Sequence, residues 1–150
     1  MSTAALLAAQ SLPASADDHV IQMLNKDPDN KKSRNVFKPL ISVIEPGTEL
    51  MFKSVNKGHN TESIKGMIPD GVEKWKSKPS KDFALTIEKP GFYGYKCTPH
   101  VATGMVGLII CKSDGVMDNL AAAQKVKQKG KAKKVWDAIW EQAEADGFLA

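Results

Sequence analysis

Short apolar segments separated by turn-forming residues dominate the chain between residues 19 and 111. In one segment Phe83, Leu85 and Ile87 alternate with small or polar residues, which is the period of a strand with one buried face. Pro-Gly pairs at 46–47 and 90–91 are typical of the turns between strands. This pattern predicts an antiparallel β-sandwich, with strands at residues 19–25, 40–44, 49–55, 82–88, 92–96 and 106–111.

The pattern changes after Gly115, where Ala, Lys, Gln and Glu become frequent. Helices are predicted over residues 116–124 and 132–145, because these residue types favour helix and Gly130 separates the two segments. Trp136 and Trp140 are four residues apart, so they share one helix face. We expect that face to pack against the sandwich.

Length and composition predict a single domain. With 150 residues, 42% of them hydrophobic, the chain can bury a substantial core. Residues 1–16 carry no charge and end in the small residues Ala14-Ser15-Ala16, the pattern of a signal-peptide cleavage site. The expected organisation is therefore a residual signal peptide at 1–16, followed by one mature domain at 17–150 that includes the helices from about 116. No apolar run is long enough to predict membrane insertion.

The charge balance favours acidic partners. The chain has 21 Lys and Arg against 17 Asp and Glu, a formal net charge of +4. Nucleic acid is not an expected partner, because the aromatic residues do not alternate with the lysines in any known binding module, and Arg34 is the only arginine.

Four residues form a complete set of soft-metal ligands. Cys97, His100 and Met105 lie close together as Cys-x2-His-x4-Met, and His59 lies upstream in a Gly-His-Asn segment. A thiolate, two imidazoles and a thioether suit copper that changes between two oxidation states. Pro99 stiffens the loop between Cys97 and His100 and has no N–H to donate to the thiolate. The set predicts a mononuclear blue-copper site for one-electron transfer.

Other functions use some of these residues but leave others unexplained. A nucleophilic Cys97 with His59 or His100 as base would give Met105 no role, and structural zinc prefers Cys and His alone. A copper storage or delivery protein remains the main alternative. An oxidase would need further copper ligands, and His19 is the only other histidine. We therefore expect no enzymatic activity. Cys111, the second cysteine, is expected to be buried and to behave as a small apolar residue.

The chain resembles the pseudoazurins, periplasmic blue-copper proteins of the cupredoxin superfamily. The resemblance rests on Lys-Cys-Thr-Pro-His at 96–100, Gly104-Met105, the run at 56–65 and Met-Ile-Pro at 67–69. It implies an all-β, Greek-key cupredoxin sandwich with two C-terminal helices. It also implies that His59, Cys97 and His100 are the trigonal copper ligands and that Met105 is the axial ligand. Asn60 and Pro99 would lie next to these ligands and hold them in position without binding the metal.

The resemblance further implies how electrons would leave. His100 would reach the surface through an apolar patch that includes Pro99, Ala102 and Met67. Around this patch would lie four lysines that dock the partner: Lys26, Lys57, Lys76 and Lys96. The implied partners of a periplasmic monomer are acidic redox proteins, namely copper nitrite reductase of denitrification, or cytochromes. Differences from the family pattern lie at 27–32, which we expect to form a longer loop, at Asn35 and at Cys111.

Overall fold

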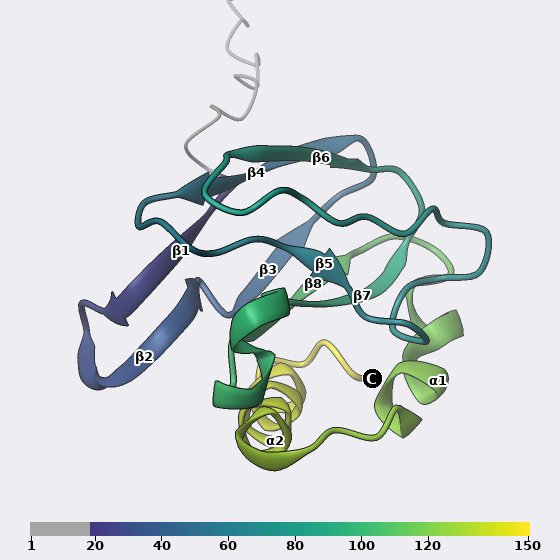
Figure 1. Cartoon of the computed structure of the whole chain (residues 1–150). Helices are drawn as coiled ribbons and strands as arrows, with labels where there is room; N and C mark the ends of the chain where they lie inside the picture. Colours follow the sequence, from purple (N-terminus) through teal and green to yellow (C-terminus); the bar gives the residue numbers. More distant parts are fainter. Residues whose placement is uncertain (1–18) are drawn as a thin grey trace, which may run out of the picture.

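Two four-stranded sheets face each other in the computed structural model, which describes residues 19–150 (Figure 1). One sheet has the order β2-β1-β4-β6 and the other β3-β8-β7-β5. The predicted signal peptide at 1–16 lies outside the described residues. The strands are β1 Val20–Asp27, β2 Asn30–Lys38, β3 Ile41–Ile44, β4 Thr48–Ser54, β5 Glu62–Ser63, β6 Phe83–Ile87, β7 Gly91–Lys96 and β8 Val106–Cys111.

The predicted sandwich is confirmed, with corrections to its strands. Strands β2 and β5 were not predicted, and the expected long loop at 27–32 was wrong, because β1 and β2 are joined by a tight turn at residues 28–29. β2 begins with a polar run and forms the edge of its sheet, so backbone pairing with β1 rather than apolar alternation defines it. The sheets are also not wholly antiparallel, because β1 pairs with β4, and β3 with β8, in parallel.

Two apolar cores position the site. The first lies between the sheets and includes Phe37, Phe52, Tyr95, Cys97 and Met105. The second lies on the other face of β7 and β8, where side chains from the C-terminal helices cover the sheet. Strands β7 and β8 are therefore buried on both faces, which holds their ends firmly. Cys111, at the end of β8, is a fully buried free thiol, as expected.

The C-terminal helices are confirmed, with a 3₁₀ turn at their start. The 3₁₀ helix η4 (Val116–Asn119) precedes α1 (Leu120–Lys125) and α2 (Gly130–Ala145). Trp136 is buried and its ring lies 5.5 Å from that of Trp140, so the shared face packs inward as predicted. Within residues 19–150, no helix combines the length and apolar character needed to cross a membrane.

Candidate metal centre

The β7–β8 hairpin carries three of the four predicted ligands. Cys97 follows β7 directly, His100 lies in the 3₁₀ helix η3 (Thr98–Thr103), and Met105 immediately precedes β8. The backbone N–H of Cys97 donates to the carbonyl of Met105 over 3.0 Å, and the N–H of Met105 donates to the carbonyl of His100 over 3.2 Å. The loop at 97–105, here called the Cys97 loop, is therefore closed by its own backbone.

The fourth residue, His59, comes from the segment after β4 and faces the hairpin. The Nδ1 atoms of His59 and His100 lie 3.2 Å apart, and the Cys97 Sγ lies 3.5 Å from His100 Nδ1 and 3.8 Å from His59 Nδ1. Three donors spaced evenly around one ion, at ordinary metal–nitrogen and metal–sulfur distances, would lie about 3.5 to 3.7 Å apart. The three donor atoms thus fit a single trigonal metal ion.

His59 presents its unprotonated nitrogen to that centre because Asn25 orients the ring. His59 Nε2 lies 2.7 Å from the side-chain oxygen of Asn25, an acceptor, so the ring proton sits on Nε2 and leaves the Nδ1 lone pair free. Asn25 was not predicted as part of the site. Its position in a strand carried no signal, because the contact forms only when the strand β1 and residue 59 meet across the fold.

Burial and neighbouring charge set the protonation of the donors. Burial, and then the nearby His100, lowers the pKa of His59, so this imidazole stays neutral and able to bind a metal. Burial raises the pKa of the Cys97 thiol, while backbone hydrogen bonds from Asn60 and His100 oppose that rise. A bound cation would stabilise the thiolate form in this site.

Asn60 joins the two ligand-bearing loops. Its side-chain oxygen accepts from the backbone N–H of Thr98 over 2.7 Å, and its amide nitrogen donates to the Thr98 hydroxyl over 2.9 Å. The same nitrogen donates to the carbonyl of Ser77 over 3.2 Å. Since Asn60 is buried, these hydrogen bonds fix the distance between His59 and the Cys97 loop.

Met105 and Pro99 occupy different environments. Met105 is fully buried in the apolar core that also contains Cys97. Pro99 is exposed at the start of η3, where its fixed φ suits the first helical turn. Gly104, just before Met105, has a φ of 95°, and the Cβ of any other residue would lie 3.0 Å from a methyl carbon of Val135 in α2. The C-terminal helix therefore packs directly against the Cys97 loop.

The surface near His100 differs in part from the expectation. His100 is half-buried, and Pro99 and Ala102 are exposed beside it. Met67 was wrongly placed in the exposed patch: it is fully buried, and its sulfur accepts from the Gln128 side-chain amide over 3.3 Å. Met67 packs among the helix-side core residues, which removes it from the surface.

The predicted docking lysines are not equivalent in their surroundings. Lys26, Lys57 and Lys76 are exposed. Lys96 is half-buried, and its ammonium lies 3.9 Å from the carboxylate of Glu62.

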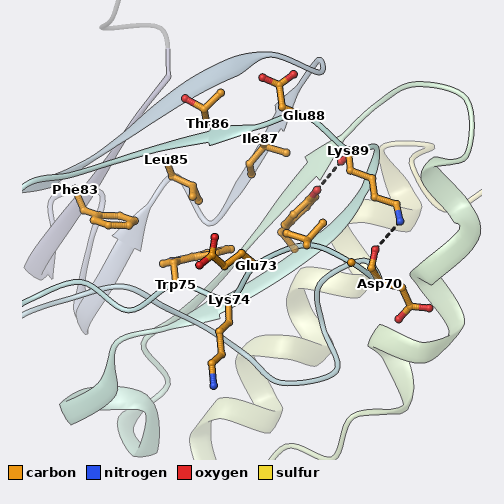
Figure 2. A pocket seen from close by; sticks show the side chains of 13 residues that line it. Asp70, Glu73, Lys74, Trp75, Phe83, Leu85, Thr86, Ile87, Glu88 and Lys89 are labelled. Atoms are coloured by element: carbon orange, nitrogen blue, oxygen red, sulfur yellow. Dashed lines mark hydrogen bonds between the residues drawn. The ribbon is translucent and has the colours of Figure 1, made fainter.

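A pocket of about 650 Å³ lies apart from the four ligands, along strand β6 (Figure 2). Phe83, Leu85 and Ile87 point into it, and its lining contains neither cysteine nor histidine. Cys97 is fully buried, and this pocket, formed within residues 19–150, does not include it in its lining. The geometry thus gives no support to a nucleophilic Cys97.

Comparisons with known proteins agree with the donor set. Residues 12–112 match the family model described as copper binding proteins, plastocyanin/azurin family. The chain is 42% identical over 135 residues to a pseudoazurin of Paracoccus pantotrophus, a match that covers 90% of each chain, and 37% identical to one of Methylorubrum extorquens, covering 93% of this chain and 91% of the relative.

A solved structure shares the fold. The crystal structure of pseudoazurin from Methylobacterium extorquens AM1 superposes with a TM-score of 0.75 at 36% identity, covering 82% of this chain and 96% of the other. Its agreement with the described chain extends well beyond the ligand loops. Fold, family model and donor chemistry together indicate a single type 1 copper site.

Proposed function

Since the chain belongs to the plastocyanin/azurin family of copper-binding proteins, we propose that it carries single electrons between redox proteins of the periplasm. The observation that carries this proposal is the triangle of His59, Cys97 and His100 donor atoms, with edges of 3.2, 3.5 and 3.8 Å. Copper bound there would supply a one-electron Cu(I)/Cu(II) couple.

His59, Cys97, His100 and Met105 would hold the copper. Both ligand-bearing loops are held by hydrogen bonds that do not involve the metal, so the donors stay in place whichever oxidation state is bound. Such preorganisation favours repeated electron transfer. It argues against a copper storage or delivery protein, whose ligands would need to open to release the metal.

His100 would be the point of electron exchange. It is half-buried, whereas His59 and Cys97 are 1% and 0% exposed, so among these three donors His100 comes closest to a docked protein. Pro99 and Ala102 beside it give a small apolar contact. The predicted docking lysines would attract an acidic partner into a weak, rapidly dissociating complex, as redox encounters require.

The partners that suit this surface are acidic redox proteins. By family resemblance we propose copper nitrite reductase of denitrification, with cytochromes as other donors or acceptors, and a monomeric carrier. The uncharged N-terminal segment with its Ala-Ser-Ala ending supports export to the periplasm.

Copper titration tests the proposal. We expect one equivalent of Cu(II) to give an intense thiolate-to-copper absorption band and an EPR spectrum with unusually small copper hyperfine splitting, both absent in Cys97→Ser. His19→Gln is the matched control, because His19 lies outside the donor cluster, and it should leave both signals unchanged. A pale, ordinary Cu(II) spectrum from the unaltered protein would contradict the proposal.

A further inference from the structure

We propose that a basic groove beside the Cys97 loop binds an acidic, extended segment of the redox partner, as a second contact next to His100. The groove, here called the β2–α2 groove, has a volume of about 410 Å³ and is lined by residues 27, 32–37, 40, 103, 104, 131 and 135. Figure 1 shows η3 of the Cys97 loop between β2 and α2. The inference rests on the proposed function, because it requires an acidic redox partner.

Three cations in the groove are available to a partner. Lys32, Arg34 and Lys131 are exposed, and none of them forms an ion pair within residues 19–150. The neighbouring Lys38 is different, because its ammonium lies 2.9 Å from Asp27 and 2.6 Å from Asp29. The one carboxylate in the lining, Asp27, is therefore already neutralised by Lys38, and the groove keeps its positive charge.

The positive charge of Arg34 on β2 lies where it is expected to destabilise the fold. Arg34 lies directly opposite Lys26 in the antiparallel β1–β2 pair. Like charges at such positions destabilise a sheet. A residue that opposes folding in this way indicates a role other than stability. Its partner in the pair, Lys26, is itself one of the predicted docking lysines.

The charge on α2 is placed unfavourably as well. The first turn of α2 contains no acidic residue, and Lys131 follows Gly130 at the end of the helix where the macrodipole is positive. Lys133 is paired with Asp137 at 2.9 Å, whereas Lys131 lines the groove and has no ion pair with any residue from 19 to 150. Two separate elements thus bring adverse positive charge to the same depression.

Protection of a sheet edge explains only part of this arrangement. Lysines on an edge strand prevent unwanted pairing, and β2 is the edge of its sheet. That role gives no reason for Lys131 on a helix to face the same groove. Nucleic acid is also a poor occupant, because the only aromatic residue of the lining, Phe37, is 1% exposed and offers no stacking surface.

The decisive variant is Arg34→Glu, because stability and function should change in opposite directions. A carboxylate opposite Lys26 replaces a repulsive pair with an attractive one, so the thermal midpoint should stay the same or rise. Electron transfer to copper nitrite reductase, measured by stopped flow at low ionic strength, should slow by about 3- to 10-fold. Lys131→Glu should slow it similarly, and a hexaglutamate peptide should inhibit the unaltered protein more than Arg34→Glu.

Lys112→Glu is the matched control, since Lys112 follows β8 at the end remote from the Cys97 loop, and its rate should change less than twofold. The groove proposal is overturned if Arg34→Glu and Lys131→Glu transfer electrons as fast as the unaltered protein while Lys57→Glu transfers them more slowly. In that case the proposed function stands. If the unaltered protein exchanges no electrons with any acidic redox protein, the proposed function itself fails.

Discussion

The two loops that carry the ligands are held in different ways. The segment at 55–61, here called the His59 loop, is held by side chains of other elements as well as by backbone bonds. Asn25 bonds the His59 ring over 2.7 Å, the Ser80 hydroxyl accepts from the Gly58 N–H over 2.9 Å, and the Ser80 N–H donates to the His59 carbonyl over 2.9 Å. The Cys97 loop is closed by backbone bonds across the β7–β8 hairpin and packs against Val135 of α2.

This difference shows that one metal site can depend on two kinds of support. Polar side chains fix the His59 loop, so single substitutions far from it in sequence should alter His59. Backbone pairing and apolar packing fix the Cys97 loop, so it should respond to steric change more than to loss of one side-chain hydrogen bond. Asn60 is the point at which the two kinds of support meet.

Removing the link between the loops should have the largest effect. Asn60→Ala deletes three hydrogen bonds in a buried place and leaves the Thr98 N–H without its partner, so we expect a loss of about 2 to 4 kcal/mol in the free energy of unfolding. The blue absorption band should also shift, because the distance between the loops is released. Chemical denaturation and copper spectra of the same variant would measure both.

Thr98→Val is the control for Asn60→Ala. It removes two hydroxyl bonds, the one accepted from Asn60 and the one donated to the Glu62 carboxylate over 2.8 Å, but it keeps the backbone bond from Thr98 to Asn60. Because the Asn60 bonds to the Thr98 N–H and to Ser77 remain, its effect should be smaller. Equal losses in the two variants would mean that Asn60 does not act as the link.

Glycine substitutions compare the loops sterically. Gly104 and Gly58 have almost the same φ, 95° and 94°, so alanine at either position meets the same backbone strain, about 1 to 2 kcal/mol. Only at Gly104 would the new Cβ also meet Val135, at 3.0 Å, whereas nothing lies within 4 Å at Gly58. Gly104→Ala should therefore lower the free energy of unfolding more than Gly58→Ala.

Adding Val135→Ala should remove the excess cost at Gly104 and leave the part due to backbone strain. Thermal or chemical denaturation of the copper-free proteins would measure all three variants. A Gly58→Ala cost as large as that of Gly104→Ala would contradict the packing of α2 against the Cys97 loop.

The copper-free protein should become less stable as pH falls from 7 to 5. The pKa of His59 is lower in the folded protein than its unfolded value of about 6.5, because His59 is buried and faces His100. Below about pH 6.5 the unfolded chain therefore binds this proton before the folded chain does, and the free energy of unfolding decreases. His59→Gln should show a weaker decrease in denaturation experiments over this range. An identical pH profile for both proteins would rule out His59 as the cause.

The sequence predicted the Cys97 loop better than the His59 loop, for a physical reason. Cys97, His100 and Met105 are close in sequence, and β8, which follows them, is an apolar strand whose predicted bounds were correct. The supports of His59 come from elsewhere: Asn25 and Ser80 are polar residues that resemble any surface residue until the strands meet. Strand β2 was missed for the same reason, because tertiary pairing defines it.

The smallest expected effect distinguishes the docking lysines of the two loops. Lys57 in the His59 loop is exposed and has no ion pair within residues 19–150, whereas Lys96, next to the Cys97 loop, lies 3.9 Å from Glu62. If Lys57 belongs to the proposed docking surface, it would contribute an uncompensated charge there, so Lys57→Gln should slow electron transfer to an acidic partner by about 2- to 3-fold at low salt. Lys96→Gln should slow it less, because Glu62 already offsets its charge, and Lys112→Gln should have no effect.

Stopped-flow rates over a range of salt concentrations would test this order of effects, since the electron-transfer rates of the three variants should converge as screening increases. Equal slowing by Lys57→Gln and Lys112→Gln would show that net charge, and not a localised ring of lysines, attracts the partner.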